Sequence, residues 1–141
     1  MATQSTVHFT SSSFGSHHIV YVHHDGYPEH RGAQIMELLT ACKDEMHDAR
    51  FEDAGIIAAR FVGYMLNKYH EMNLKYGQTH PLGAISVRLV NDDPGGINYR
   101  YVVRCDNIEA DGLLEVTYTE IPWDDNVEEV SCNLKTSLTS K

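Results

Sequence analysis

The chain has 141 residues, enough for one domain and too few for two of ordinary size. Apolar residues make up 42% of it and charged residues 22%, which excludes a disordered or fibrous chain. The longest apolar stretch, Ala54 to Leu66, contains Arg60 and is too short to span a bilayer, so no membrane partner is expected. The first residues lack the basic region and apolar run of a secretory signal, and we expect none.

The net charge is strongly negative, because 11 Lys and Arg stand against 20 Asp and Glu, a formal charge of −9. Nucleic acid backbones reward a basic surface, so no direct nucleic-acid binding is expected, although an acidic surface can imitate a nucleic acid. Three cysteines, Cys42, Cys105 and Cys132, form no CxxC pair. Their spacing favours reduced thiols and a cytoplasmic location over disulfides or a zinc site.

The N-terminal part is predicted to form a β-hairpin, with strands around Thr6 to Thr10 and over His17 to His23. The pair Asp25-Gly26 breaks the second strand in a turn. Pro28 then suits the first position of a helix, and Glu29 complements the helix dipole there.

Two helices are predicted next. The first carries apolar residues at helical spacing, which gives one buried stripe: Ile35, Leu38, Leu39, Cys42 and Met46. The second starts near Asp53, a good N-cap, and runs to about Tyr69. It is apolar nearly all round, so we expect it to form a subunit interface as well as core contacts.

Three strands are predicted after the helices, over Ala84 to Val90, Ile97 to Cys105 and Leu113 to Ile121. The first two are expected to form a hairpin across the turn at 91–96. The order ββααβββ predicts an α+β fold, a single domain over 1–121 with an antiparallel sheet and a two-helix insertion. Residues 122–141 are acidic with a Ser/Thr ending, and we expect an extended C-terminal tail.

Arginines are the most informative polar residues. Arg88, Arg100 and Arg104 fall on the expected hairpin, with Arg88 across from Arg100. Like charges opposed across strands are destabilising, which suggests a bound anion such as a phosphate. The alternative is that each pairs with its own carboxylate, for example Glu115 or the acidic tail.

Other side chains extend this candidate site. Arg60, as the only charge in its apolar stretch, is expected to be buried and so to need a carboxylate or an anion as partner. Tyrosines near the basic positions are candidates for stacking on a base, or simply core residues. The candidate ligand-binding residues are Arg60, Arg88, Arg100, Arg104, Tyr99, Tyr101 and Tyr27.

A metal site and catalysis are not expected. Histidines crowd the second strand and the turn after it, but no HExxH or HxH pattern places two ligands beside a carboxylate: His17, His18, His23, His24 and His30. No nucleophile elbow is visible, and neither GxGxxG nor GxxxxGK[ST] occurs, so we expect no catalytic residue and no cofactor.

The segment Tyr21 to Glu29, YVHHDGYPE, resembles a YxHxDGYPE motif of small phage and bacterial proteins. Length and element order also resemble the phage proteins that defeat Thoeris immunity. The resemblance is specific over about nine residues and loose elsewhere. It implies a homodimer or higher homo-oligomer in the host bacterial cytosol that sequesters a cyclic ADP-ribose signal or cyclic oligonucleotide without cleaving it. No ligand contact of that family maps onto a residue here.

Three functions therefore compete. The first is a non-catalytic sponge for a phosphorylated nucleotide, in which arginines hold phosphates and a tyrosine stacks on the base. The second is an acidic decoy that imitates phosphates and inhibits a host nucleic-acid enzyme, through acids such as those at 44–45, Asp48, 52–53 and the tail. The third is a small-nucleotide hydrolase using His23, His24 or His30.

Overall fold

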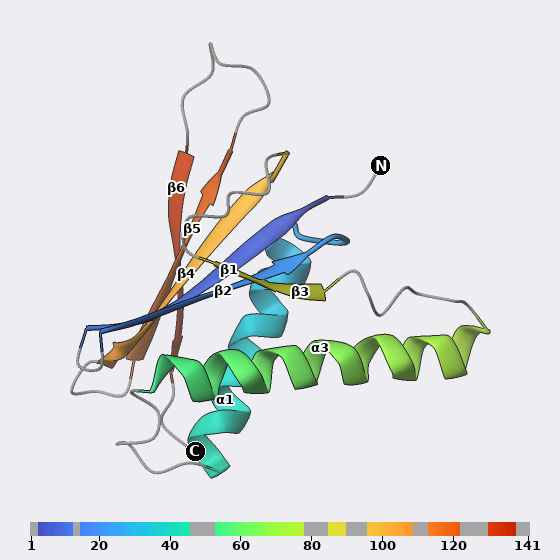
Figure 1. Ribbon diagram of the computed structural model, residues 1–141, viewed down its shortest axis with the longest axis horizontal. Helices are drawn as coiled ribbons and strands as arrows, with labels where there is room; N and C mark the ends of the chain where they lie inside the picture. The colour runs from blue at the N-terminus through green and yellow to red at the C-terminus, as the bar shows by residue number, and fades with distance from the viewer. Residues whose placement is uncertain are drawn as a thin grey trace.

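A six-stranded sheet with helices on one face organises the chain (Figure 1). The computed structural model describes residues 3–12, 15–45, 53–77, 85–89, 96–108, 113–121 and 130–137. In chain order the elements are β1 (Ser5–Ser11), β2 (Ser16–Val22), a short π-helix η1 (Pro28–Gly32), α1 (Ala33–Glu45), α3 (Ala54–Tyr76), β3 (Ile85–Arg88), β4 (Tyr99–Ile108), β5 (Leu113–Glu120) and β6 (Val130–Ser137).

The sheet is mixed, with strand order β3-β2-β1-β4-β5-β6. Every neighbouring pair is antiparallel except β1 and β4, which run parallel. The prediction of an α+β fold with two helices inserted after the first hairpin is confirmed in outline, whereas the prediction of a purely antiparallel sheet is wrong. A parallel pair needs a long crossover, and here α1, α3 and β3 all lie between the two strands in the chain.

The predicted hairpin from Ala84 to Cys105 does not form. β3 pairs with β2, and β4 pairs with β1 and β5, so two strands separate β3 from β4. Arg88 therefore lies opposite Ile19, and Arg100 lies opposite Thr6. Alternation of apolar and polar residues identified both strands, but it carries no information about which strand each one pairs with.

A sixth strand lies inside the segment that we expected to be an extended tail, 122–141. β6 pairs with β5 along its whole length and forms one edge of the sheet. Its sequence alternates Val130, Cys132 and Leu134 with polar residues, which is the pattern of a strand with one apolar face. Residues 122–129 and 138–141 lie outside the described part.

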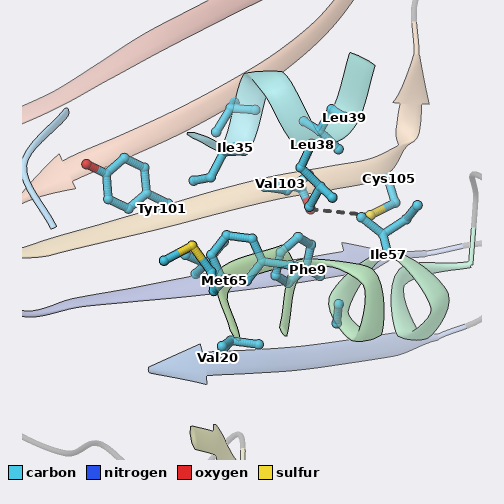
Figure 2. Packing of buried hydrophobic residues seen from close by; sticks show 14 of the residues in the cluster. Phe9, Val20, Ile35, Leu38, Leu39, Ile57, Met65, Tyr101, Val103 and Cys105 are labelled. Carbon is cyan, nitrogen blue, oxygen red and sulfur yellow. Dashed lines mark hydrogen bonds between the residues drawn. The ribbon is translucent and has the colours of Figure 1, made fainter. Parts of the chain in front are cut away.

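Helix α3 begins as predicted, because the Asp53 carboxylate accepts from the amides of Gly55 at 3.0 Å and Ile56 at 3.3 Å. It ends at Gly77, whose φ of 62° suits glycine. One stripe of α3 packs on the sheet of the same chain, where Ile57 and Met65 lie beside Phe9 and Val20 (Figure 2). The other side is exposed at Gly63 and Leu66.

Helix α1 completes the core, as its predicted stripe indicated. Ile35, Leu38 and Leu39 are buried and lie over Val103 of β4 (Figure 2). Cys42 is buried with them, whereas Met46 lies outside the described residues. Within the described helices, none combines the length and the hydropathy needed to cross a bilayer.

The turn after β2 is held against β1 by close backbone contacts. Asp25 has a φ of 55°, and the Gly26 amide donates to the Thr3 carbonyl at 2.9 Å. The Gly26 carbonyl accepts from the Tyr101 hydroxyl at 2.6 Å. A Cβ at Gly26 would lie 2.7 Å from Cβ of Ser5 and 2.9 Å from the Thr3 oxygen. Glycine is therefore required, and the Asp-Gly part of the motif has a structural role.

We expect Gly26→Ala to lower the free energy of unfolding by about 2 kcal/mol, because β1 must move to accommodate the methyl group. The matched control is Gly63→Ala on exposed α3, where an added Cβ meets nothing within 4 Å. That change should raise stability by roughly 0.5–1 kcal/mol. Urea unfolding followed by circular dichroism measures both. Equal effects of the two substitutions would contradict the tight turn.

Candidate functional site

The two faces of the sheet differ in cover and in chemistry. Helices α1 and α3 lie on one face (Figure 1), and no described helix covers the other, here called the open face. Alternation and register place these residues on the open face: Thr6, His8 and Thr10 of β1, His17, Ile19 and Tyr21 of β2, Ser86 and Arg88 of β3, and Arg100, Val102 and Arg104 of β4. Its charged side chains at these positions are all basic.

The structure brings together some of the predicted site residues and separates others. Arg88, Arg100 and Arg104 share the open face, but the predicted placement of Arg88 across from Arg100 is wrong. By the same alternation, Tyr99 and Tyr101 belong to the helix-covered face. The remaining two, Tyr27 before η1 and Arg60 on α3, are exposed and lie on neither strand face.

The three strand arginines are spread out rather than clustered. Arg100 and Arg104 stand four residues apart on β4, about 13 Å along the strand. Arg88 is three strands away. Among the described residues, neither Arg100 nor Arg104 forms an ion pair with a carboxylate. The side chain of Glu115, the neighbour considered as their partner, lies outside the described part.

A histidine pair stands beside Arg100. Nδ1 of His8 lies 2.8 Å from Nε2 of His17, and the ring centres are 5.1 Å apart. Burial, His17 and Arg100 together lower the pKa of His8 to about 4. His8 is therefore neutral at pH 7. Sequence reasoning missed His8, although polar Thr6, His8 and Thr10 alternate with the core residues Val7 and Phe9 on β1.

The aromatic ring that accompanies a basic side chain on the open face is Tyr21. The Arg88 guanidinium carbon lies 5.2 Å from the centre of this ring. The Tyr21 hydroxyl donates to Oε1 of Gln4 at 2.9 Å and lies 2.8 Å from Nδ1 of His23. Tyr21 was quoted within the motif but was not predicted to belong to the site.

The two predicted tyrosines of β4, Tyr99 and Tyr101, lie on the helix-covered side of the sheet. Tyr101 is fully buried, and its ring centre lies 6.5 Å from that of Tyr99 and 5.8 Å from that of Tyr118. Burial raises the pKa of Tyr101, which keeps its hydroxyl protonated for the bond to Gly26. Tyr27 is 40% exposed and contacts the ring of His30 at 5.7 Å.

Arg31 is the buried arginine among the described residues, and the prediction that Arg60 is buried is wrong, because Arg60 is exposed. Arg31 is 0% exposed and donates to the His24 carbonyl, to Gln34 Oε1 and to the sulfur of Met65, the last at 3.2 Å. Burial lowers its pKa, while Tyr69, Tyr101 and Asp25 favour its charged form: their interactions raise the pKa of Arg31. Arg31 thus stabilises the turn after β2 through its hydrogen bond to the His24 carbonyl, which is a structural role.

In the described segments, no three or more His, Cys, Asp or Glu side chains gather as metal ligands would. His23 and His24 contact each other edge to face, with ring centres 4.7 Å apart, and His23 also contacts Tyr21. The open face instead offers guanidinium groups and imidazoles, which are suited to holding an oxyanion.

Comparison of the chain with models of protein families, with curated proteins and with solved structures finds no match in any of the three. The structural class is defined by the fold and the open face alone. It is an α+β domain whose mixed sheet has helices on one side and a basic polar surface on the other. The resemblance of the YVHHDGYPE segment to phage proteins stays a prediction.

The pKa of His8 predicts a pH-dependent stability. The unfolded chain binds a proton at His8 near its ordinary pKa of 6.5, whereas the folded protein resists it down to about 4. Stability is therefore full above pH 6.5 and is lost as the pH falls toward 4. Because His8 is partly exposed, we expect a loss of about 1–2 kcal/mol. Urea unfolding at several pH values should show this loss in the native protein and not in His8→Gln.

Arg31→Gln should lower the free energy of unfolding by about 2–4 kcal/mol, because the His24 carbonyl loses its buried donor and the side chain leaves a gap. The matched control is Arg60→Gln at an exposed position of α3, with an expected change within about 0.5 kcal/mol. Thermal and urea unfolding measure both. A larger effect at Arg60 would contradict this assignment of the buried arginine.

Proposed function

We propose that this protein binds a phosphorylated nucleotide on the open face of its sheet and sequesters it without chemical change. The observation that carries the proposal is the placement of Arg100 and Arg104 on that face, with no carboxylate paired to either among the described residues. Guanidinium groups bind phosphate oxygens through two parallel hydrogen bonds, and they keep their charge at every physiological pH.

A small ligand fits the charge distribution better than a nucleic acid. The chain as a whole carries −9, which repels a long polyanion approaching from outside. A nucleotide needs only local positive charge, and Arg100 and Arg104 on the open face supply it. The acids of the decoy hypothesis at 44–45, 48 and 52 lie outside the described side chains, and Asp53 is used as the cap of α3.

The polar residues across from the two arginines support nucleotide binding. Thr10 lies opposite Arg104 on the neighbouring strand, and Thr119 lies opposite Arg100. Hydroxyl groups at such positions donate to phosphate or ribose oxygens. The phenol ring of Tyr21 lies on this face beside the planar guanidinium of Arg88. This ring is therefore the candidate for stacking on a base.

Binding without turnover is the form of the proposal that the sequence favours, because it contains no nucleophile elbow and no metal-binding pattern. His8 and His17 bond to each other, and His23 bonds to Tyr21. The biological setting that the sequence resemblance implies, a homo-oligomeric phage sponge for a cyclic nucleotide immune signal in the bacterial cytosol, belongs to this proposal.

The test incubates the purified protein with a panel of cyclic and linear nucleotides, removes unbound ligand by filtration and releases bound ligand by heat. We expect one member of the panel to be recovered intact. The double variant Arg100→Gln, Arg104→Gln should lose about tenfold or more in affinity, since each charge-assisted hydrogen bond contributes about 1.5–3 kcal/mol. The control Arg60→Gln, on α3, should retain the affinity. Native mass spectrometry gives the subunit count and the bound mass together.

Other outcomes separate the alternatives. Recovery of an altered ligand would favour the hydrolase. If every nucleotide of the panel passes into the filtrate and none is retained by the protein, the proposal is overturned. The acidic decoy would be favoured if, in addition, a nucleic-acid enzyme were captured in a salt-sensitive way and released when the acids were neutralised.

A further inference from the structure

The His8–His17 pair gives the open face a group that can change its charge. We propose that the pair contacts the bound anion and takes up one proton from solvent as the anion binds beside Arg100. This inference rests on the proposed function, because it concerns the same surface. It adds that binding is coupled to pH, which arginines alone would not produce.

The hydrogen bond between the rings determines which hydrogen-bond donors and acceptors the pair presents to a ligand. Two neutral imidazoles contain one N–H each, and one of these lies between Nδ1 of His8 and Nε2 of His17, 2.8 Å apart. The pair then presents one outward N–H and one outward lone pair, whichever ring donates. A proton added to that lone pair gives a second outward donor and a net charge of +1. The proton comes from hydronium or a buffer acid, whose bond to it breaks as the new N–H bond forms, and water or the buffer base is released.

Without an anion, the surroundings oppose this proton. Directly across from His8 lie the apolar Ile19 of β2 and Val102 of β4. The polar and charged groups around it on the same face are His17 and Tyr21 from β2, Arg100 and Arg104 from β4, and neutral Thr6 and Thr10 on its own strand. Arg88 lies beyond β2, and the side chain of Glu115 on β5 is outside the described residues. Among the described groups every permanent charge is positive. Burial and this positive charge account for the pKa of about 4.

A bound oxyanion favours the protonated form of the histidine pair. Seated against Arg100, it compensates the guanidinium charge and accepts a hydrogen bond from the protonated pair. By linkage, a ligand that raises the proton affinity of the pair binds more tightly as the pH falls. Uptake of one proton corresponds to at most about a tenfold change in affinity per pH unit.

Sulfate is a suitable probe, because it stays doubly charged over this range and so adds no titration of its own. The ring protons of the histidines would be followed by NMR between about pH 4 and 8, in sulfate and in chloride at matched ionic strength. We expect sulfate to raise the apparent pKa of His8 by about half a unit or more. His70, exposed on α3, is the internal reference and should not move.

Variants then locate the effect. In His8→Gln, sulfate affinity should lose its dependence on pH while the Arg100 contribution remains. In Arg100→Gln, both the affinity and the shift of His8 should be lost. His70→Gln is the matched control, and it should behave like the native protein. The same titration with 3′,5′-cyclic AMP, a phosphodiester, extends the test to a nucleotide.

The outcomes distinguish this inference from the proposed function. If sulfate or cyclic AMP shifts the backbone amides of β1 and β4 while the pKa of His8 stays unchanged, proton uptake is overturned and anion binding stands. An equal shift at His8 and His70 would also overturn it, since that indicates general screening. If neither probe perturbs the open face and the nucleotide panel is also negative, the proposed function fails as well.

Discussion

The pairing of β1 with β4 is the constraint on which the rest of the structure depends. β1 is the second inner strand, antiparallel to β2 on one side and parallel to β4 on the other. This single parallel ladder joins the N-terminal hairpin to the C-terminal three strands. It also sets the register that places Arg100 beside Thr6 and Arg104 beside Thr10. A shift by one residue would move both arginines to the helix-covered face and bury them.

The same strand organises two different polar environments. On the covered side, Gly26 packs against Ser5, and Tyr101 and Arg31 supply donors to the backbone of the turn. These contacts are buried, so their donors and acceptors must be matched within the protein. On the open side, His8 lies on β1 between β2 and β4, where burial, His17 and Arg100 lower its pKa. The first environment holds the fold, and the second is available for binding.

Arginines illustrate why residue type alone does not assign a role. Arg31 is fully buried and serves the backbone, Arg60 is exposed on a helix, and Arg100 stands on a basic face in a chain of net charge −9. Their difference comes from position relative to the sheet. The acidic excess keeps the molecule as a whole repulsive to polyanions, while the strands gather positive charge on one surface. The proposed selectivity for a small anion is based on that contrast.

The sequence by itself determined the elements whose signals are local. Alternation marked the strands other than β6, helical spacing marked the stripe of α1, Asp53 marked the start of α3, and Asp-Gly marked the turn that the structure shows to be tight. It also indicated that the basic residues of the strands share a face, since Arg88, Arg100 and Arg104 do.

Only the tertiary structure decided which strands pair and what lies between the arginines. The predicted hairpin was replaced by pairings between distant segments, and Val130–Ser137 became an edge strand instead of a tail. Local patterns fix which side of a strand is apolar, but partner choice depends on how the helices cross the sheet and close the core. For that reason Arg31, His8 and Tyr21 acquired their roles only once β1, β2 and β4 lay side by side.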